Sequence, residues 1–370
     1  MGEQRDSERN FVKGNKDMRN IKINQKGNRL TRLVLCAVLT LLLALSVFTV
    51  SFSATDGEAE LRLIPGGIPF GVKFSTEGVV VVGFCDLNGA AKSQNPAYAA
   101  GLRPKDVIVK IDGRPITDAA ELTRLVESSG GREISLTYLR SGAERTARLS
   151  PVFSKADGKY KTGMWVRDSG AGIGTVTYID PSTCCFGGLG HGICDGDTGE
   201  LIPMHRGVVM DVTISAIKKG VSGAPGEIKG YFGTSKKGSL YGNTECGVYG
   251  MFSELPKELG EAIPVGKHDE VKCGEAYILC TLENGVRQRY EIEISSVNRE
   301  AKGSKCFLIK ITDPKLIEKT GGIVQGMSGS PIIQNGKLVG AVTHVMINDP
   351  TTGYGIFIEN MLDQMGDLAL

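Results

Sequence analysis

The stretch that most constrains the fold lies near the C-terminus, where residues 326–331 read GMSGSP. Glycine at 326 permits a backbone conformation closed to other residues. The amides of Gly326 and Ser328 can then point the same way, as an oxyanion hole requires. An apolar run follows, then Asn335-Gly336, the preferred two-residue turn between hairpin strands. The stretch therefore predicts a nucleophilic serine on a tight turn that leads into a β-hairpin.

The rest of the chain favours strands as well. Fifty glycines and few aromatic residues among 370 favour many short strands and turns over helical bundles. The G-x-S-G-x-P turn resembles the nucleophile turn of chymotrypsin-like serine peptidases. We therefore expect a mainly β fold, with a double β-barrel peptidase domain over residues 162–370. The candidate strands are 172–178, 208–217, 226–232, 247–252, 276–282, 288–296 and 306–311.

A serine hydroxyl needs a base to become a nucleophile at neutral pH. Four histidines are available, and His191 is flanked by glycines that leave room around its ring. It is the predicted base, whereas His205 and His268 lie in polar stretches and are expected at the surface. The strand after the Asn-Gly turn should pair with the substrate backbone, so that its histidine lines the cleft instead. The expected substrate edge is Thr343, His344 and Val345.

The acid that would orient His191 is left open by the residues alone. Asp211 lies in a β-branched run, and a position between the histidine and the serine suits an acid of the first barrel. Asp313 precedes Pro314, which suits the cap of a helical turn. The other candidates are Asp195 and Asp197, which suit a turn, and Asp269.

The N-terminal third resembles a PDZ domain over residues 65–152. Residues 95–108 (NPAYAAGLRPKDVI) predict a short capped helix, a glycine stop and a strand. Apolar residues recur at three- and four-residue steps after Asp118, as on one face of an amphipathic helix. The loop 67–74 (GIPFGVKF) resembles the PDZ carboxylate-binding loop, in which backbone amides hold a peptide terminus. This assigns the peptide groove to Phe70, Gly71 and Val72.

The N-terminus is basic and then apolar. Residues 1–32 hold nine Lys and Arg against four Asp and Glu, which leaves 34 basic and 37 acidic residues in the remainder. Residues 33–55 carry no charge, and about 20 apolar residues suffice to cross a bilayer. We expect a basic cytoplasmic tail, a transmembrane signal-anchor at 33–55 and a linker at 56–64, with the rest exported. The small residues 51–54 leave cleavage of the anchor open. Nucleic-acid binding is not expected.

Nine cysteines are present, of which Cys36 lies in the apolar segment. The other eight permit disulfides in an exported domain, but their spacing names no pairs. Cys184, Cys185, Cys194 and His191 lack the C-x-x-C spacing of a zinc site. We expect no metal and no cofactor.

Together, these features resemble the stage IV sporulation signalling peptidase (protein B) family of endospore-forming bacteria. The closest resemblance lies in residues 188–192 (GLGHG) and in residues 321–345. It implies a serine endopeptidase exported from the forespore into the space between the two cell membranes. There it would process itself and cleave a membrane-bound inhibitor of an intramembrane metalloprotease, which activates a late sigma factor. It also implies His191 as base, Asp313 as acid and Ser328 as nucleophile.

Two rival functions come from other classes. A PDZ-containing quality-control protease usually has its PDZ domain after the catalytic domain, which is the reverse of the order here. A non-enzymatic PDZ adaptor would have a pseudo-peptidase domain, against which the intact serine turn and the glycine-flanked His191 argue. Met327 also departs from the digestive enzymes, which keep an aspartate there to pair with a newly cut N-terminus. Activation of that kind is not expected.

Overall fold

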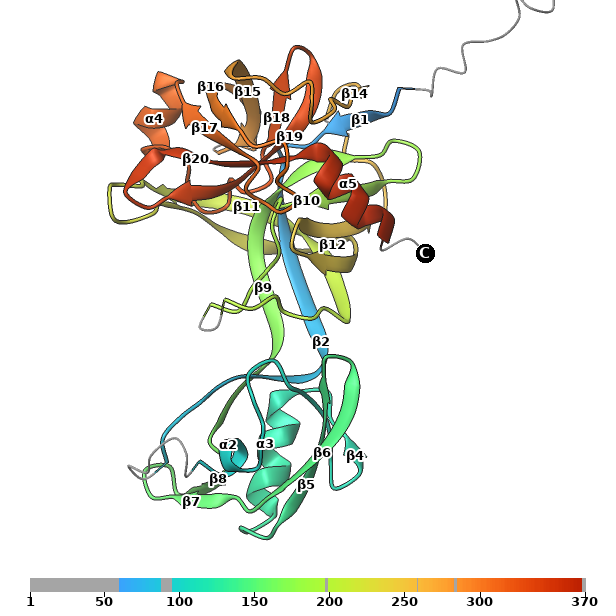
Figure 1. Cartoon of the computed structure of the whole chain (residues 1–370), viewed down its shortest axis with the longest axis vertical. Helices are drawn as coiled ribbons and strands as arrows, with labels where there is room; N and C mark the ends of the chain where they lie inside the picture. Colours follow the sequence, from blue (N-terminus) through green and yellow to red (C-terminus); the bar gives the residue numbers. More distant parts are fainter. Residues whose placement is uncertain (1–59, 88–94, 197–198, 258, 283–284, 368–370) are drawn as a thin grey trace, which may run out of the picture. The chain divides into compact units, whose positions relative to one another are not determined.

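The computed structural model describes residues 60–87, 95–196, 199–257, 259–282 and 285–367. The predicted basic tail and membrane segment lie outside these residues. No helix within the described ranges is long and apolar enough to cross a membrane. Strands dominate the described chain, so the fold is mainly β, as predicted (Figure 1).

Six antiparallel strands form a first barrel, called barrel 1. Their order is β9-β10-β13-β12-β11-β2, and β2 pairs with β9 to close the ring. Phe70, Val72 and Phe74 are buried inside because alternate side chains of a strand face the same side. The strands are β2 (Pro69–Phe84), β9 (Met164–Ile179), β10 (Cys185–Gly188), β11 (Arg206–Lys218), β12 (Glu227–Thr244) and β13 (Gly247–Phe252), with β1 (Arg62–Pro65) and β14 (Ile263–Pro264) at the edge.

A second closed barrel, barrel 2, has the order β15-β16-β17-β20-β19-β18. Its core includes Ile278, Ile294 and Ile309, all fully buried. Asn335 and Gly336 both have positive φ (52° and 78°), the geometry of the predicted hairpin turn. The strands are β15 (Gly274–Thr281), β16 (Arg287–Val297), β17 (Phe307–Ile311), β18 (Pro331–Gln334), β19 (Lys337–Met346) and β20 (Asp349–Phe357), and the helices are α4 (Pro314–Thr320) and α5 (Ile358–Asp367).

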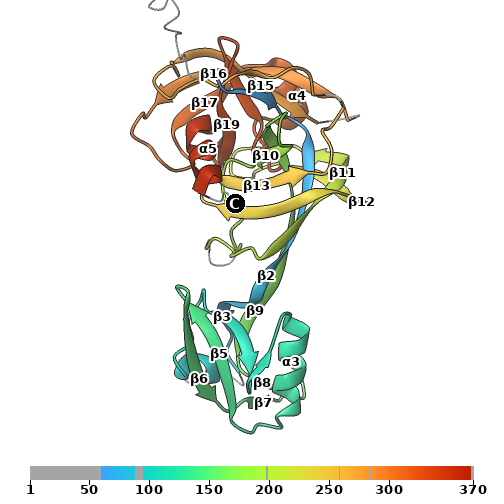
Figure 2. The ribbon, with the colours of Figure 1, turned by 90° about the vertical axis from the view of Figure 1, so that its right-hand side faces the viewer.

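The PDZ module is inserted between two strands of barrel 1. The first half of β2 pairs with residues 169–175 of β9, and its second half pairs with residues 164–167 of the same strand (Figures 1 and 2). The second half of β2 and the first residues of β9 pack on a separate apolar core that includes Val79, Leu122 and Val126. The other elements are α2 (Pro96–Ala99), β3 (Val107–Ile111), β4 (Arg114–Pro115), α3 (Ala119–Ser128), β5 (Ile134–Arg140), β6 (Ala143–Leu149), β7 (Val152–Ser154) and β8 (Lys159–Lys161).

This insertion corrects the predicted domain boundaries. Residues 69–75 belong to barrel 1 rather than to the PDZ module, and residues 62–64 of the predicted linker form β1, which pairs with β14 and β9. The sequence could not show this because β2 is one continuous strand, and its buried residues do not say which sheet they pack against.

The predicted PDZ groove is also wrong. Phe70 and Val72 lie in the core of barrel 1, and Gly71 is paired on both sides, with Ile173 and Met210. A strand paired on both sides has no free edge to which a peptide could add. The PDZ edge beside α3 is instead the start of β9, where the Asp168 carboxylate accepts a hydrogen bond from the first amide of α3 (2.8 Å).

Candidate active site

Ser328 lies on a turn that is tied to both barrels. Gly326 and Gly329 flank it with φ of 99° and 94°, values that favour glycine, as the sequence predicted. Thr175 of barrel 1 donates its amide to the Ser328 carbonyl (3.0 Å) and its hydroxyl to the Gly326 carbonyl (2.7 Å). The turn leads directly into β18 of barrel 2. These bonds fix the nucleophile turn against barrel 1.

The two amides expected in the oxyanion hole are oriented by the carbonyls that precede them. The carbonyls of Gln325 and Met327 both accept hydrogen bonds. Because a trans peptide holds its N–H opposite its C=O, the amides of Gly326 and Ser328 point away from those donors. Neither amide has a hydrogen-bond partner within the described chain, so both are available to an oxyanion. The Gln325 carbonyl accepts from Ile228 N–H (2.8 Å). The Met327 carbonyl accepts from the N–H and the Oγ of Ser330 (2.9 and 2.7 Å).

His191 follows β10 through two residues with left-handed backbone. Leu189 and Gly190 have φ of 66° and 67°, and a Cβ at Gly190 would lie 2.9 Å from the Thr343 side chain. The Nδ1–H of His191 donates to the Gly192 carbonyl (2.9 Å), which leaves Nε2 as the acceptor. Burial lowers the pKa of His191 below 6.5, while the bond to Gly192 opposes the shift. The ring is therefore neutral at pH 7, as a base must be.

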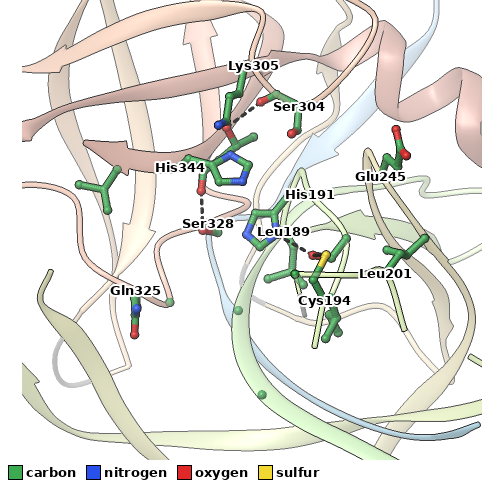
Figure 3. Close-up of a pocket in the computed structure, with 18 of the residues that line it drawn as sticks. Leu189, His191, Cys194, Leu201, Glu245, Ser304, Lys305, Gln325, Ser328 and His344 are labelled. Carbon is green, nitrogen blue, oxygen red and sulfur yellow. Dashed lines mark hydrogen bonds between the residues drawn. The ribbon is translucent and has the colours of Figure 1, made fainter. Parts of the chain in front are cut away.

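His344 packs beside His191, with ring centroids 4.9 Å apart and planes tilted by 39° (Figure 3). Burial lowers its pKa to about 4, helped by repulsion from His191 when that ring is protonated and by the positive charge of Lys305. Its Nδ1 is buried and has no hydrogen-bond partner among the described residues. His344 therefore stays neutral and lines the cleft, as predicted for the substrate edge.

These residues line one cleft of about 1080 Å³. The cleft brings together His191, Ser328, Gly326 and the edge formed by Thr343, His344 and Val345. The Ser328 Oγ donates to the Thr343 carbonyl (2.7 Å). Attack requires this bond to be exchanged for one to His191 Nε2, because the hydroxyl proton must reach the base.

Asp313 is not brought to His191. Its carboxylate accepts hydrogen bonds from the amides of Lys315 and Leu316 (2.9 and 3.1 Å) and from that of Glu291 (3.3 Å). It is the N-cap of α4, the role that an aspartate before proline favours. The assignment of Asp313 as triad acid is therefore wrong for this geometry.

No other carboxylate within the described ranges takes that place. Asp211 is exposed on β11 and does not line the cleft, and Asp195 pairs with Arg167 (2.5 Å). Asp197 lies outside the described residues. Among the described residues none places a carboxylate against the His191 ring, so the Gly192 carbonyl is the group that holds its tautomer.

Sequence reasoning missed two residues that support the site. Thr175 fixes the serine turn, and Asn243 braces the loop after His191. The Asn243 side chain donates to the carbonyls of Ile193 and Ile202 (both 2.9 Å) and accepts from the Ile193 amide (2.8 Å). Neither has a motif in the sequence, because each acts on a segment distant along the chain.

The comparisons with known proteins give the family of the chain. Residues 158–362 match the model of the family described as SpoIVB peptidase S55, and residues 58–150 match a PDZ domain. The first match covers more than half of the chain. The chain belongs to the SpoIVB peptidase S55 family. It carries the peptidase domain of that family and a PDZ domain.

Other similarities are shorter or weaker. A putative zinc metalloprotease of Neisseria meningitidis is 40% identical over 63 residues, 17% of this chain and 14% of that protein. The magnetosome formation protease MamE of Paramagnetospirillum magneticum is 32% identical over 99 residues, 26% of this chain and 14% of that protein. The chain thus spans a small part of these curated relatives. The active form of the Rv3671c protease of M. tuberculosis matches 68% of this chain and 88% of its own at 13% identity, with a TM-score of 0.32, too low to carry an argument.

Proposed function

We propose that this serine peptidase is an exported endopeptidase that processes itself and cleaves a membrane-bound regulatory protein during endospore formation. That cleavage would release an intramembrane protease that activates a late sigma factor. The observation that supports the proposal most directly is the cleft in which His191, Ser328 and two unpaired amides meet. Family membership and the basic and apolar N-terminal pattern support the sporulation setting and the membrane anchor.

The geometry supports an acyl-transfer mechanism. His191 Nε2 takes the Ser328 proton as Oγ attacks the scissile carbonyl, and the amides of Gly326 and Ser328 stabilise the oxyanion. The imidazolium then gives its proton to the leaving amine, which produces an acyl-enzyme. Water repeats the sequence and releases the second product. The Gly192 carbonyl keeps the Nδ1 proton in place throughout.

A serine-directed fluorophosphonate tests the nucleophile. Wild type should be labelled on Ser328, and Ser328→Ala should lose the label. Ser304→Ala is the matched control, since Ser304 lines the same cleft and should not affect labelling. Labelling that persists in Ser328→Ala would contradict the assignment, and Ser330 would be the next candidate.

Self-processing is proposed upstream of Leu61. The sequence places the window at residues 52–64, but residues from Arg62 onward pair with β14 and β9 and cannot lie extended in a cleft at the same time. Wild type should be shortened during sporulation, and Ser328→Ala should accumulate at full length, as an immunoblot would show. Equal shortening of both proteins would show that another protease makes the cut.

A further inference from the structure

We infer that Ile323 closes the floor of the subsite for the side chain before the scissile bond, so that the enzyme cleaves after small apolar residues. The inference deepens the proposed peptidase mechanism and rests on it. The subsite, called the S1 slot, is the space between residues 323–326 and residues 343–345, and all of these line the catalytic cleft.

The position of the slot follows from the reacting atoms. The scissile carbonyl carbon must lie at Ser328 Oγ, with its oxygen at the amides of Gly326 and Ser328. The substrate backbone before that bond can pair with the edge at Thr343, because β18 ends its pairing with β19 at Ala341. The side chain of the substrate residue before the scissile bond then points into the space between residues 323–326 and residues 343–345.

The walls of the slot carry no charge. Ile323, Val324 and Gln325 form one side and Val345 lies on the other. The charged residues of the cleft come from other segments. A basic or acidic substrate side chain in the slot would lose water without gaining a counter-charge, which is costly. The charged cleft residues are Glu200, Glu245, Lys302 and Lys305.

The depth of the slot is limited by Ile323. This residue is only 2% exposed, and its amide donates to the Pro350 carbonyl (2.7 Å), which fixes its backbone. Its Cδ1 packs on Gly353, where an added Cβ would lie 2.5 Å from that methyl. Gly353 of β20 pairs with Val345 of β19, which lies on the opposite side of the slot. The Ile323 side chain therefore spans the bottom of the slot, from its own segment to the strand that pairs with the opposite wall. The slot therefore ends at this side chain and admits residues such as alanine or valine.

Peptidyl diphenyl phosphonates test the slot without a known substrate, because Ser328 attacks phosphorus and phenoxide leaves. A set that differs only in the side chain for this subsite would carry alanine, valine, phenylalanine or lysine. Wild type should react at least about tenfold faster with the alanine and valine probes than with the other two. Ile323→Ala should raise the ratio of the reaction rate with the phenylalanine probe to that with the alanine probe about tenfold or more. The shorter side chain leaves room for the larger probe, and one methylene in a hydrophobic pocket changes selectivity by about this factor.

Two further variants complete the design. Ile323→Val removes one methylene and should give an intermediate ratio in a protein that folds. Ile317→Ala is the matched control, since Ile317 is 37% exposed on α4 and outside the cleft, and its ratio should equal that of wild type. Fastest reaction of wild type with the lysine or phenylalanine probe would overturn the inference. So would an unchanged ratio in both Ile323 variants.

The design also separates this inference from the proposed function. If wild type takes the fluorophosphonate label but shows another side-chain preference, only the S1 slot is wrong. If wild type takes neither the label nor any phosphonate, the peptidase mechanism itself is contradicted, and the slot with it.

Discussion

The two barrels differ in how the chain builds them. Barrel 2 is continuous, from β15 to β20, and supplies Ser328. Barrel 1 is interrupted by the PDZ module between β2 and β9, and supplies His191. The insertion also contacts the part of the cleft that holds His191. Arg167, in the segment of β9 that belongs to the PDZ module, forms an ion pair with Asp195 in the loop after His191. One half of the catalytic pair therefore depends on a discontinuous sheet, and the other on a local hairpin.

The largest expected effect tests whether the two barrels act as one site. His191→Ala in barrel 1 and Ser328→Ala in barrel 2 should each lower kcat by at least about 10⁴, because nucleophile and base act as a unit. The double variant should be no worse than either single one. Turnover on a cleaved peptide measures this, with circular dichroism to check the fold. Additive losses in the double variant would contradict a shared mechanism.

The second prediction concerns the discontinuous barrel. A Cβ at Gly71 would lie 2.4 Å from the Phe232 ring, so Gly71→Ala should lower the free energy of unfolding by about 1–3 kcal/mol. Gly172→Ala is the matched control in the paired strand, since nothing lies within 4 Å of its Cβ position. Urea denaturation compares the two. A Gly71→Ala variant that is fully stable but defective only in peptide recognition would restore the PDZ groove predicted from the sequence.

The third prediction concerns Asp313 beside the continuous barrel. Asp313→Ala removes the cap of α4 and should lower the free energy of unfolding by about 1 kcal/mol. Asp313→Asn keeps a good cap and should leave turnover largely unchanged. Chemical denaturation and peptide turnover check the two variants. A stable Asp313→Asn with a loss of about 10⁴ in kcat would show instead that Asp313 is the triad acid.

The smallest expected effect is a shift in pH dependence. The ring of His191 is buried, and burial disfavours the charged imidazolium, so its pKa is lowered below 6.5. The base is neutral, and therefore active, at pH values above its pKa. As the pH is lowered, activity should persist to below pH 6.5 and fall only when the pH approaches the lowered pKa of His191. The acid limb of kcat/KM against pH measures this, and His205→Gln on the exposed surface should not move it. An acid limb above pH 6.5 would show that the ring is not buried during turnover.

The local features of this protein follow from residues that are neighbours in the chain. Gly326 and Gly329 predicted the serine turn, because only glycine adopts their backbone angles freely. Asn335-Gly336 predicted the hairpin, and short runs separated by turn residues predicted strands such as β13 and β17. His191 and Ser328 were found from their immediate neighbours, and the structure brings both to the cleft.

Strand pairing and the contacts between distant side chains could be seen only in the folded chain. The two halves of β2 form one continuous strand, yet the first belongs to barrel 1 and the second to the PDZ module. Asp313 suited both a cap and a triad acid, and its distance from the base was settled by the folding of barrel 2. Strand pairing joins residues far apart in the chain, and alternation records only that one face is buried, not what it is buried against.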